Sequence, residues 1–313
     1  MTAAPDTRAV ADTGPVSITV AVCTFQRPAL LARALASLDV LTIPPGAAVD
    51  IVVVDNDPAG SAGSLVRGMT LAHRLRYLHE PEPGIAAARN SALRAASSSD
   101  YVAFIDDDEV AEPGWLAALL ATATAYDADV VAGPTNSAFA KTPPAWIQAG
   151  GFFARAVART GSPVPYGACG NLLLRTSALQ RLDHHFDNRF GLTGGEDSEF
   201  TARLLNRGAR LVWCQEAITT EDVPAERITA RWVLRRSYRM GNTLGRLQMS
   251  AGVRLARPRI VGGGFARLLA GTASMALSPL PRREHWAVGL RLACRGAGMV
   301  AAGTGVSIVE YRR

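Results

Sequence analysis

The sequence is short of cysteine and histidine and has no close pair of cysteines. Its four cysteines are far apart, so none forms the pair that a zinc site or a redox dithiol needs: Cys23, Cys169, Cys214 and Cys294. Reduced, buried thiols in a cytosolic protein are therefore expected. The adjacent His184 and His185 are interpreted as a loop pair, because neighbouring side chains rarely point at one metal ion.

The start of the chain lacks the basic segment, apolar core and cleavage site of a secretory signal. We interpret residues 1–15, which are small and polar, as a disordered lead. No repeat of fixed period is visible either. With 313 residues, 48% of them hydrophobic, the chain is expected to bury a sizeable core as one large domain with an appendage.

Charge is distributed unevenly along the chain, whose net charge is +6. Residues 224–313 hold 16 Arg and three acids, giving +13, whereas residues 1–223 hold 17 basic and 24 acidic side chains, giving −7. An acidic body thus carries a strongly basic tail. This asymmetry indicates a polyanionic partner, which is either nucleic acid or an anionic membrane face.

Short runs rich in β-branched and aromatic residues predict strands at residues 18–25, 51–55, 101–105, 130–133, 171–174 and 211–214. Helix signals separate them: Pro28 opens a helix over 29–38, Gly84 precedes 85–96, Pro113 opens 114–126 and Gly208 ends one from about 196 to 207. This alternation is typical of an α/β fold with a mostly parallel central sheet flanked by helices.

Polar sequences follow the first three predicted strands, namely Thr24-Phe25-Gln26-Arg27, Asp55-Asn56-Asp57 and Asp106-Asp107-Asp108. In open α/β sheets ligands bind at the carboxyl ends of the strands, because the loops converge there and the following helices point their N-termini at the ligand. The shared position of the three sequences therefore indicates one site.

The three aspartates leave an apolar strand together and enter a loop, where ionised neighbours repel one another. A hard divalent cation such as Mg²⁺ or Mn²⁺ relieves that repulsion and can bridge two phosphate oxygens of a nucleoside diphosphate. Alternation along an extended segment places Asp106 and Asp108 on one side. We assign nucleotide and metal binding to these two and a secondary role at the nucleotide sugar to Asp107. The alternative is a solvated acidic turn.

Five segments resemble, in order, the signature of family 2 glycosyltransferases with the GT-A fold: residues 20–27, 53–57, 83–90, 106–108 and 194–199. Within that family the chain is similar to the succinoglycan-biosynthesis group of β-glucosyltransferases, through residues 55–58, 84–90, 106–109 and 191–199. The resemblance implies a Rossmann-like nucleotide-diphospho-sugar transferase domain at residues 16–245 and a basic helical appendage at 246–313. It also implies an inverting, metal-dependent enzyme that transfers one sugar, with UDP-glucose as the preferred donor.

The resemblance further implies roles for single residues at the nucleotide sugar. Thr24 and Asp55 correspond to residues that contact uridine, Arg89 corresponds to an arginine near the base and diphosphate, and Arg27 belongs to the same nucleotide-binding sequence as Thr24. Asp55 can accept hydrogen bonds from uracil or ribose, and Arg89 offers a planar fork of donors to an anion. Without the family, Asp55 is alternatively a turn residue and Arg89 a solvated helix residue.

Residues 194–199, Gly-Gly-Glu-Asp-Ser-Glu, open a predicted helix, where the backbone dipole favours carboxylates. The resemblance places the general base at the last acid of the Glu-Asp pair, Asp197, with Glu196 as the alternative. A carboxylate there can deprotonate an acceptor hydroxyl as it attacks the anomeric carbon, which inverts that carbon. A capping role remains the competing interpretation.

The basic tail begins with a predicted helix over residues 226–242. Its Glu226-Arg227 and Arg231-Trp232 resemble, with imperfect spacing, the Gln-x-x-Arg-Trp element of processive family members. The chain lacks that Gln and long flanking transmembrane helices, which favours addition of a single sugar over synthesis and extrusion of a polymer. Arg231, Arg235 and Arg236 face either a phosphate or solvent.

The remainder of the tail raises the question of a membrane. Residues 260–280 are apolar but contain Arg267 and three consecutive glycines, which favours an interfacial segment over a spanning helix. Residues 286–304 place Arg291 and Arg295 beside an apolar face, which suits either an anionic bilayer or a helical subdomain packed on the catalytic core. In the first case the protein is peripheral at the inner face of the cell membrane, with a lipid-linked saccharide as acceptor.

Other functions fit the sequence less well. A nucleic-acid-binding protein leaves the acidic body unexplained, so no nucleic-acid partner is expected. A sugar nucleotidyltransferase typically opens with a Gly-rich basic loop, which this chain lacks. A sugar-nucleotide-binding protein without catalysis would not need Asp106, Asp108 and Asp197 together. A glycosyltransferase of a soluble small molecule or natural product stays as the alternative to one with a glycan acceptor.

Overall fold

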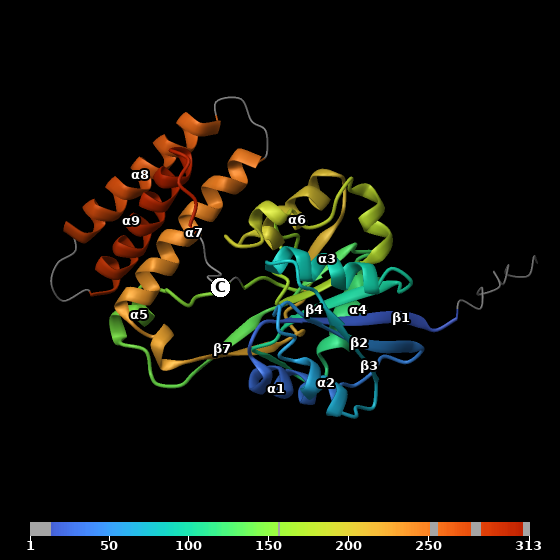
Figure 1. The fold of residues 1–313 in the computed structure, drawn as a ribbon. Coiled ribbons are helices and arrows are strands. Elements are labelled where there is room, and N and C mark those ends of the chain that lie inside the picture. The colour runs from blue at the N-terminus through green and yellow to red at the C-terminus, as the bar shows by residue number, and fades with distance from the viewer. Residues whose placement is uncertain (1–13, 156, 251–255, 277–282, 309–313) are drawn as a thin grey trace, which may run out of the picture.

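The computed structural model describes residues 14–155, 157–250, 256–276 and 283–308, which form an α/β body and a bundle of three helices (Figure 1). The lead predicted for residues 1–15 lies outside the described residues, apart from Gly14 and Pro15.

A seven-stranded sheet runs through the body in the order β3-β2-β1-β4-β8-β6-β9. Its strands are β1 (Val16–Thr24), β2 (Ala47–Asp55), β3 (Arg74–His79), β4 (Tyr101–Asp106), β6 (Val130–Ala132), β8 (Asn171–Arg175) and β9 (Leu211–Trp213). Neighbouring strands are parallel except at β8, which runs antiparallel to both β4 and β6. The mostly parallel sheet and all six predicted strands are confirmed. The edge strand β3 was not predicted, because it is half-exposed and alternates charged with apolar residues.

Helices cover both faces of this sheet (Figure 1). The helices α1 (Pro28–Asp39), α2 (Gly63–Gly68) and α4 (Trp115–Ala125) share one core with it, and α3 (Ile85–Ala95) and α6 (Glu196–Asn206) share the other. Successive side chains of β1 divide between the cores: Val20 and Val22 pack in the first, Ala21 and Cys23 in the second. Burial on both faces explains why the central strands are continuous apolar runs.

A second sheet of three short strands has the order β5-β10-β7. These strands are β5 (Glu109–Ala111), β7 (Thr135–Phe139) and β10 (Thr219–Val223). The sequence did not predict them, since these short strands mix polar with apolar residues, whereas the equally short β6 and β9 are wholly apolar. The sheet places Glu221 opposite Glu109, directly after the three aspartates.

The basic tail folds into α7 (Ala230–Ser250), α8 (Ala256–Ala276) and α9 (Arg283–Gly303). The helix predicted over 226–242 begins at Ala230, after a 3₁₀ turn at Ala225–Arg227, and continues through the predicted boundary at residue 246. α9 packs against both α7 and α8. A Cβ built at Gly241 of α7 would lie 1.9 Å from the carbonyl oxygen of Arg295, and one at Gly298 of α9 would lie 1.9 Å from that of Tyr238. Glycine is therefore required where these helices cross.

The bundle is joined to the body through α5 (Ala145–Ala149) and the loop that follows it. Ile147 and Phe152 pack with Val233 of α7 and Ala287 of α9, and Arg291 of α9 donates a hydrogen bond to the carbonyl oxygen of Gly151. Arg291 of α9 thus faces the body, whereas Arg295 contacts Met240 of α7. None of the helices in the described part of the chain has the length and apolarity needed to cross a membrane.

Candidate active site

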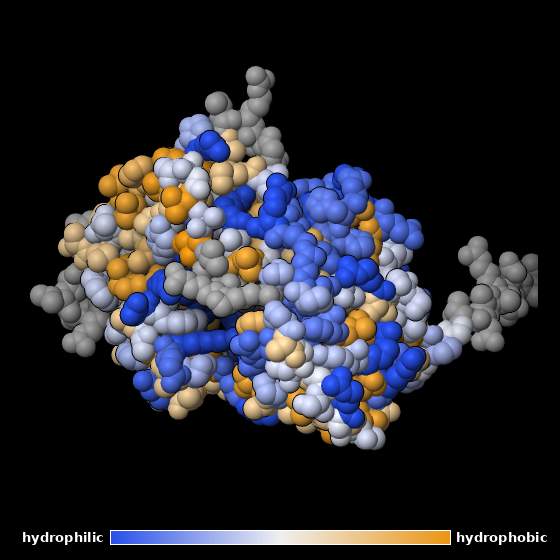
Figure 2. Space-filling view, viewed as in Figure 1, coloured by the Kyte–Doolittle hydropathy of each residue, from blue (hydrophilic) through white to orange (hydrophobic). Residues whose placement is uncertain are grey.

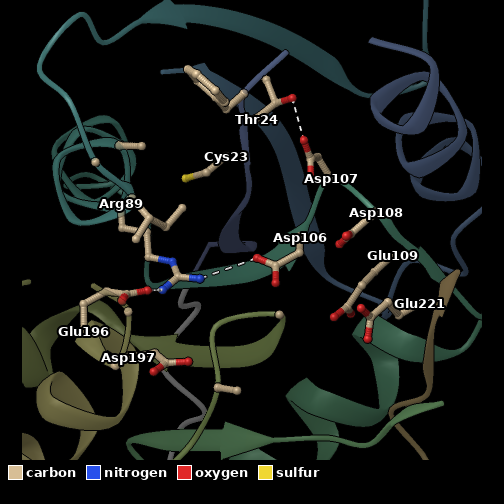
Figure 3. A pocket seen from close by; sticks show the side chains of 18 of the residues that line it. Cys23, Thr24, Arg89, Asp106, Asp107, Asp108, Glu109, Glu196, Asp197 and Glu221 are labelled. Atoms are coloured by element: carbon tan, nitrogen blue, oxygen red, sulfur yellow. Dashed lines mark hydrogen bonds and ion pairs between the residues drawn. The ribbon is translucent and has the colours of Figure 1, made fainter. Parts of the chain in front are cut away.

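The carboxyl ends of β1 and β4, the start of α6 and one side of α7 enclose a cavity of about 710 Å³. Of the predicted site residues, all except Asp55 line it: Thr24, Arg27, Arg89, Asp106, Asp107, Asp108, Glu196 and Asp197. Figure 3 shows side chains from β1, α3, β4 and α6 pointing toward one another in this space. The fold therefore gathers the residues that the strand-end argument predicted to lie together.

Asp55 is fully buried at the end of β2. Its carboxylate accepts hydrogen bonds from the backbone N–H groups of Asp57 at 3.0 Å and Ala62 at 2.8 Å, and from the Tyr77 hydroxyl at 3.1 Å. It shapes the turn after β2, while the next residue, Asn56, lines the cavity. Asn56 Oδ1 accepts from the N–H of Gly84 at 2.9 Å, which ties this turn to the start of α3.

Thr24, Arg27 and Asp107 form one hydrogen-bonded unit. The Thr24 hydroxyl donates to Asp107 Oδ2 at 2.7 Å, and Arg27 Nη1 donates to Asp107 Oδ1 at 3.3 Å and to Asp108 Oδ2 at 3.2 Å. Burial raises the pKa of Asp107 to about 6, although Arg27 and the Thr24 hydroxyl favour its charged form. Asp107 therefore connects the loops after β1 and β4, which agrees with its secondary role.

Asp106 is the most open of the three aspartates. Its side chain is 41% exposed, against 7% for Asp107 and 12% for Asp108. Burial first, and then the neighbouring carboxylates, raise the pKa values of Asp106, Asp108 and Glu109. Glu109 and Glu221 stand beside the three aspartates in Figure 3. Asp107 and Asp108 are thus not part of a solvated acidic turn, because they are crowded and largely withdrawn from water, whereas Asp106 opens into the cavity.

This donor set fits a divalent cation that the substrate helps to hold. Among the described residues, no three His, Cys, Asp or Glu side chains converge closely enough to bind a metal alone. Mg²⁺ is commonly held by one or two carboxylates together with phosphate oxygens of a substrate. Asp106 and Asp108 supply such a pair, and a cation beside them would relieve the repulsion that raises their pKa values.

Arg89 of α3 is buried between two carboxylates. Its Nη1 donates to Glu196 Oε1, and its Nη2 lies 3.5 Å from Asp106 Oδ1 (Figure 3). Burial raises the pKa of Glu196 to about 7, against the opposing effect of Arg89. With 5% of its surface exposed, Arg89 is not the solvated helix residue of the alternative interpretation. It links the aspartates at the end of β4 to the start of α6.

Asp197 follows Glu196 in the first turn of α6. The chain enters that turn through Gly194 (φ +73°) and Gly195 (φ +94°), a left-handed conformation that favours glycine. Asp197 Oδ1 accepts from the backbone N–H of Ser198 at 2.6 Å. Glu196 is engaged with Arg89, so Asp197 is the more accessible acid of the pair, at a helix start whose dipole favours carboxylates.

The opposite wall of the cavity is basic, and the sequence predicted it only in part. Arg235 and Arg236 of α7 line it, whereas Arg231 is exposed and points elsewhere. Arg155 and Arg227 join them, and both pair with Glu221. Arg155 lies in a loop with no sequence signal, and Glu221 lies in a strand that was not predicted. The segment after α9 also reaches the cavity through Ile308.

The family model described as "Glycosyl transferase family 2" matches residues 19–183 of this chain. The succinoglycan biosynthesis protein ExoM of Rhizobium meliloti (strain 1021) is 32% identical over 297 residues, which are 94% of this chain and 94% of that protein. The chain belongs to glycosyl transferase family 2. It is thus a glycosyltransferase.

Solved structures agree with the family's GT-A fold. Staphylococcus aureus TarS 1-349 aligns over 95% of this chain and 93% of its own, with a TM-score of 0.51 and 18% identity. GalNAc-T7, whose crystal holds UDP, GalNAc and Mn²⁺, aligns over 75% of this chain and 51% of its own, with a TM-score of 0.54 and 14% identity. The family match covers the aspartates but ends before Asp197. The similarity to ExoM extends over nearly the whole chain, the helical bundle included.

Proposed function

We propose that this family 2 enzyme is metal-dependent and inverting. It transfers a single sugar, with glucose from UDP-glucose as the preferred donor, to a lipid-linked saccharide or another glycan acceptor during polysaccharide biosynthesis. One observation carries the proposal: the aspartates at the end of β4 and Asp197 at the start of α6 line the same cavity. The names of similar proteins support it, because ExoM is named for succinoglycan biosynthesis and TarS crystals hold UDP or UDP-GlcNAc.

In this proposal the nucleotide lies at the carboxyl ends of β1 and β2, against Thr24, Arg27 and Asn56. Asp55 supports that site from below through the turn that carries Asn56. Asp106 and Asp108 would hold a divalent cation, Mg²⁺ or Mn²⁺, which would supply positive charge to stabilise the leaving nucleoside diphosphate. Arg89 keeps Asp106 oriented, and Asp107 holds the loop after β4 against Thr24.

Asp197 acts as the general base toward the acceptor. A carboxylate at the cavity can remove the proton of an acceptor hydroxyl as the oxygen attacks the anomeric carbon from the side opposite the diphosphate. The bond to the acceptor oxygen forms as the bond to the diphosphate breaks, so the configuration inverts. Glu196 fixes the start of α6 through Arg89. A soluble small-molecule acceptor is the alternative, and the near full-length similarity to a polysaccharide biosynthesis protein favours a glycan.

Calorimetric binding of UDP tests the donor end. Wild type is expected to bind UDP more tightly with Mn²⁺ or Mg²⁺ than with EDTA. Asp108→Ala should lose that difference, and Asp183→Ala, which removes an exposed carboxylate far along the chain, should keep it. Absence of UDP binding, or an equal metal effect in Asp108→Ala, would contradict the assignment. Transfer assays with UDP-glucose and other UDP-sugars then identify the donor, and an α-linked product from an α-linked donor would rule out inversion.

We also propose that the bundle holds the enzyme at the anionic inner face of the cell membrane. The outer side of α8 exposes Phe265 at 50% and Leu269 at 67%. Ala266, Ala270 and Ala273 continue this exposed stripe at helical spacing. Figure 2 shows hydrophobic surface gathered over this part of the bundle. Exposed arginines on the same helix supply attraction to anionic lipids: Arg257, Arg259 and Arg267.

Flotation with liposomes tests the membrane contact by point substitution, since α7 continues through residue 246 and a truncation there would cut a helix. Wild type is expected to float with anionic liposomes and less with neutral ones. Leu269→Glu should stay at the bottom, whereas Val40→Glu, at an exposed position on the body, should float like wild type. Failure of wild type to float would contradict this proposal.

A further inference from the structure

Helix α7 runs along the cavity from the end at Asp108 to the end at Asp197. Just before it, Arg227 Nη2 lies 3.6 Å from Asp108 Oδ2. Toward its end, Arg246 Nη1 donates to the Thr193 hydroxyl at 2.5 Å, and Thr243 packs against Gly195 in the loop that leads to Asp197. At 1.5 Å per residue, the helical residues from Ala230 to Thr243 span about 20 Å. Their side chains therefore flank the space between the proposed metal-binding aspartates and the proposed base, which is where an acceptor must lie.

Positive charge gathers on this wall of the cavity. Trp232, Arg235, Arg236 and Arg239 of α7 line the cavity together with Arg155. Arg155 and Arg227 both pair with Glu221, and Arg227 also lies 3.6 Å from Asp108 Oδ2. The cavity thus has an acidic wall, which carries the aspartates and the proposed base, and a basic wall, which carries these arginines.

Arg236 is the most constrained of these arginines. Its guanidinium lies over the Trp232 ring, 5.3 Å from the centroid, and over the Phe153 ring, 5.8 Å from the centroid. The two rings are stacked, with centroids 5.7 Å apart and planes 9° from parallel. No carboxylate among the described residues is close enough to form an ion pair with Arg236. Burial and the neighbouring arginines Arg155, Arg239 and Arg227 lower its pKa to about 10, against the opposing effect of Glu221.

A partly buried guanidinium among like charges is unfavourable unless an anion joins it, and the carboxylate that opposes them, Glu221, already pairs with Arg155 and Arg227. The donor diphosphate is an unsuitable partner for Arg236, because the proposed function places it at the Asp106 and Asp108 end, with Arg27 and Arg227. The aromatic rings hold Arg236 in one position, so little further conformational entropy is lost when its planar fork binds an anion.

We propose that Arg236, with Arg235 and Arg155, forms a binding site for an anionic group on the acceptor. The group is a phosphate or a carboxylate that adjoins the sugar receiving the transfer. This inference rests on the proposed glycosyl transfer and adds the substrate class to it. Because phosphate and carboxylate both accept paired hydrogen bonds from guanidinium, the source of the anion is decided by experiment.

Calorimetry with three probes of similar size tests the site, with UDP and Mn²⁺ present to fill the donor end. The probes are glucose 1-phosphate, methyl glucuronide and the neutral methyl glucoside. At least one anion is expected to bind, and methyl glucoside should bind tenfold or more weakly. Preference for glucose 1-phosphate indicates a phosphate-linked acceptor, and preference for methyl glucuronide indicates an acidic sugar.

A matched pair of variants separates a binding site from the general field of the basic tail. Arg236→Gln is expected to weaken the preferred anion roughly 10- to 100-fold. Arg231→Gln removes the same charge from an exposed position one turn earlier in α7, outside the cavity, and should bind like wild type. If Arg236→Gln unfolds, Arg235→Gln replaces it, with a weakening of at least threefold expected.

Equal weakening in the cavity and control variants, or anions that bind no more tightly than methyl glucoside, would overturn the inference. Metal-dependent UDP release without acceptor is recorded on the same proteins. Arg231→Gln, outside the cavity, should retain that release. Absence of release from wild type counts against the proposed function and not against the anion site, because anion binding is measured directly.

Discussion

Replacing Gly241 by alanine tests whether the bundle depends on backbone contact between α7 and α9. A Cβ at this position would lie 1.9 Å from the carbonyl oxygen and 2.7 Å from the carbonyl carbon of Arg295, whereas ordinary contact begins at 3.4 Å. Both atoms belong to the backbone of α9, so no change of side-chain rotamer can relieve the overlap. The two helices would have to separate by about 1.5 Å, the difference between those distances.

The magnitude follows from two opposing effects. Alanine favours a helix over glycine by about 0.8–1.0 kcal/mol. Overpacking in a close-packed interface costs about 1–3 kcal/mol. We expect the upper end of this range, because the added Cβ meets backbone atoms of α9, which cannot move as a side chain can. We therefore expect Gly241→Ala to lower the free energy of unfolding by about 2 kcal/mol. Gly262→Ala, at an exposed position of α8 where a Cβ would meet nothing within 4 Å, should raise it by up to about 1 kcal/mol.

Urea denaturation followed by tryptophan fluorescence measures both variants. Trp232 stacks on Phe153, and Trp286 packs on Trp146, so these side chains report on the contact between bundle and body. A Gly241→Ala protein at least as stable as wild type, beside a stabilised Gly262→Ala, would refute the close approach of α7 and α9.

Three further substitutions probe the body. Arg89→Met leaves Glu196 and Asp106 without their buried partner and should lower the free energy of unfolding by about 3–5 kcal/mol. The double variant Arg89→Met/Glu196→Gln should recover part of that loss. Urea titration measures both variants, and an unchanged stability of Arg89→Met would refute the buried ion pair. Asn171→Ala strands the Trp115 indole N–H and the carbonyl oxygens of Pro134 and Ala217, and should cost about 2–4 kcal/mol by the same titration; a loss below about 1 kcal/mol would contradict that network. Because the pKa of Asp107 is raised to about 6, the stability that its protonation contributes is full below the unfolded pKa near 3.8 and is lost as pH rises toward 6. Asp107→Asn should therefore flatten the pH dependence of the unfolding midpoint between these two values. An unaltered slope would argue against the raised pKa.

The sequence predicted the features that local chemistry determines. Strands buried on both faces are continuous apolar runs, and Pro28, Pro113 and Gly208 mark helix ends, so the central sheet and its helices were readable. The meeting of Thr24 with the three aspartates followed as well, because the carboxyl ends of parallel strands share one edge of the sheet.

Features that depend on long-range docking or on the rotation of one element could not be read. Glu221 reaches the aspartates through pairing of β10 with β5, and Arg155 through the packing of its loop on the bundle. Which of two adjacent residues faces the cavity depends on the dihedral angles of the turn. The sequence predicted a site residue at Asp55, whereas the next residue, Asn56, lines the cavity. The rotation of α7 likewise decides that Arg235 and Arg236 line the cavity and that Arg231 does not.

In the proposed mechanism the aspartates at the end of β4 and Asp197 act in one glycosyl transfer, the aspartates on the donor and Asp197 on the attacking hydroxyl group. UDP release from a panel of UDP-sugars tests it most directly, with Mg²⁺ or Mn²⁺ and with EDTA, for wild type, Asp108→Ala and Asp197→Asn. We expect release from wild type to require the metal and to fall roughly 100-fold or more in both variants. Release that persists in EDTA, or that continues at the wild-type rate in Asp197→Asn, would contradict the claim.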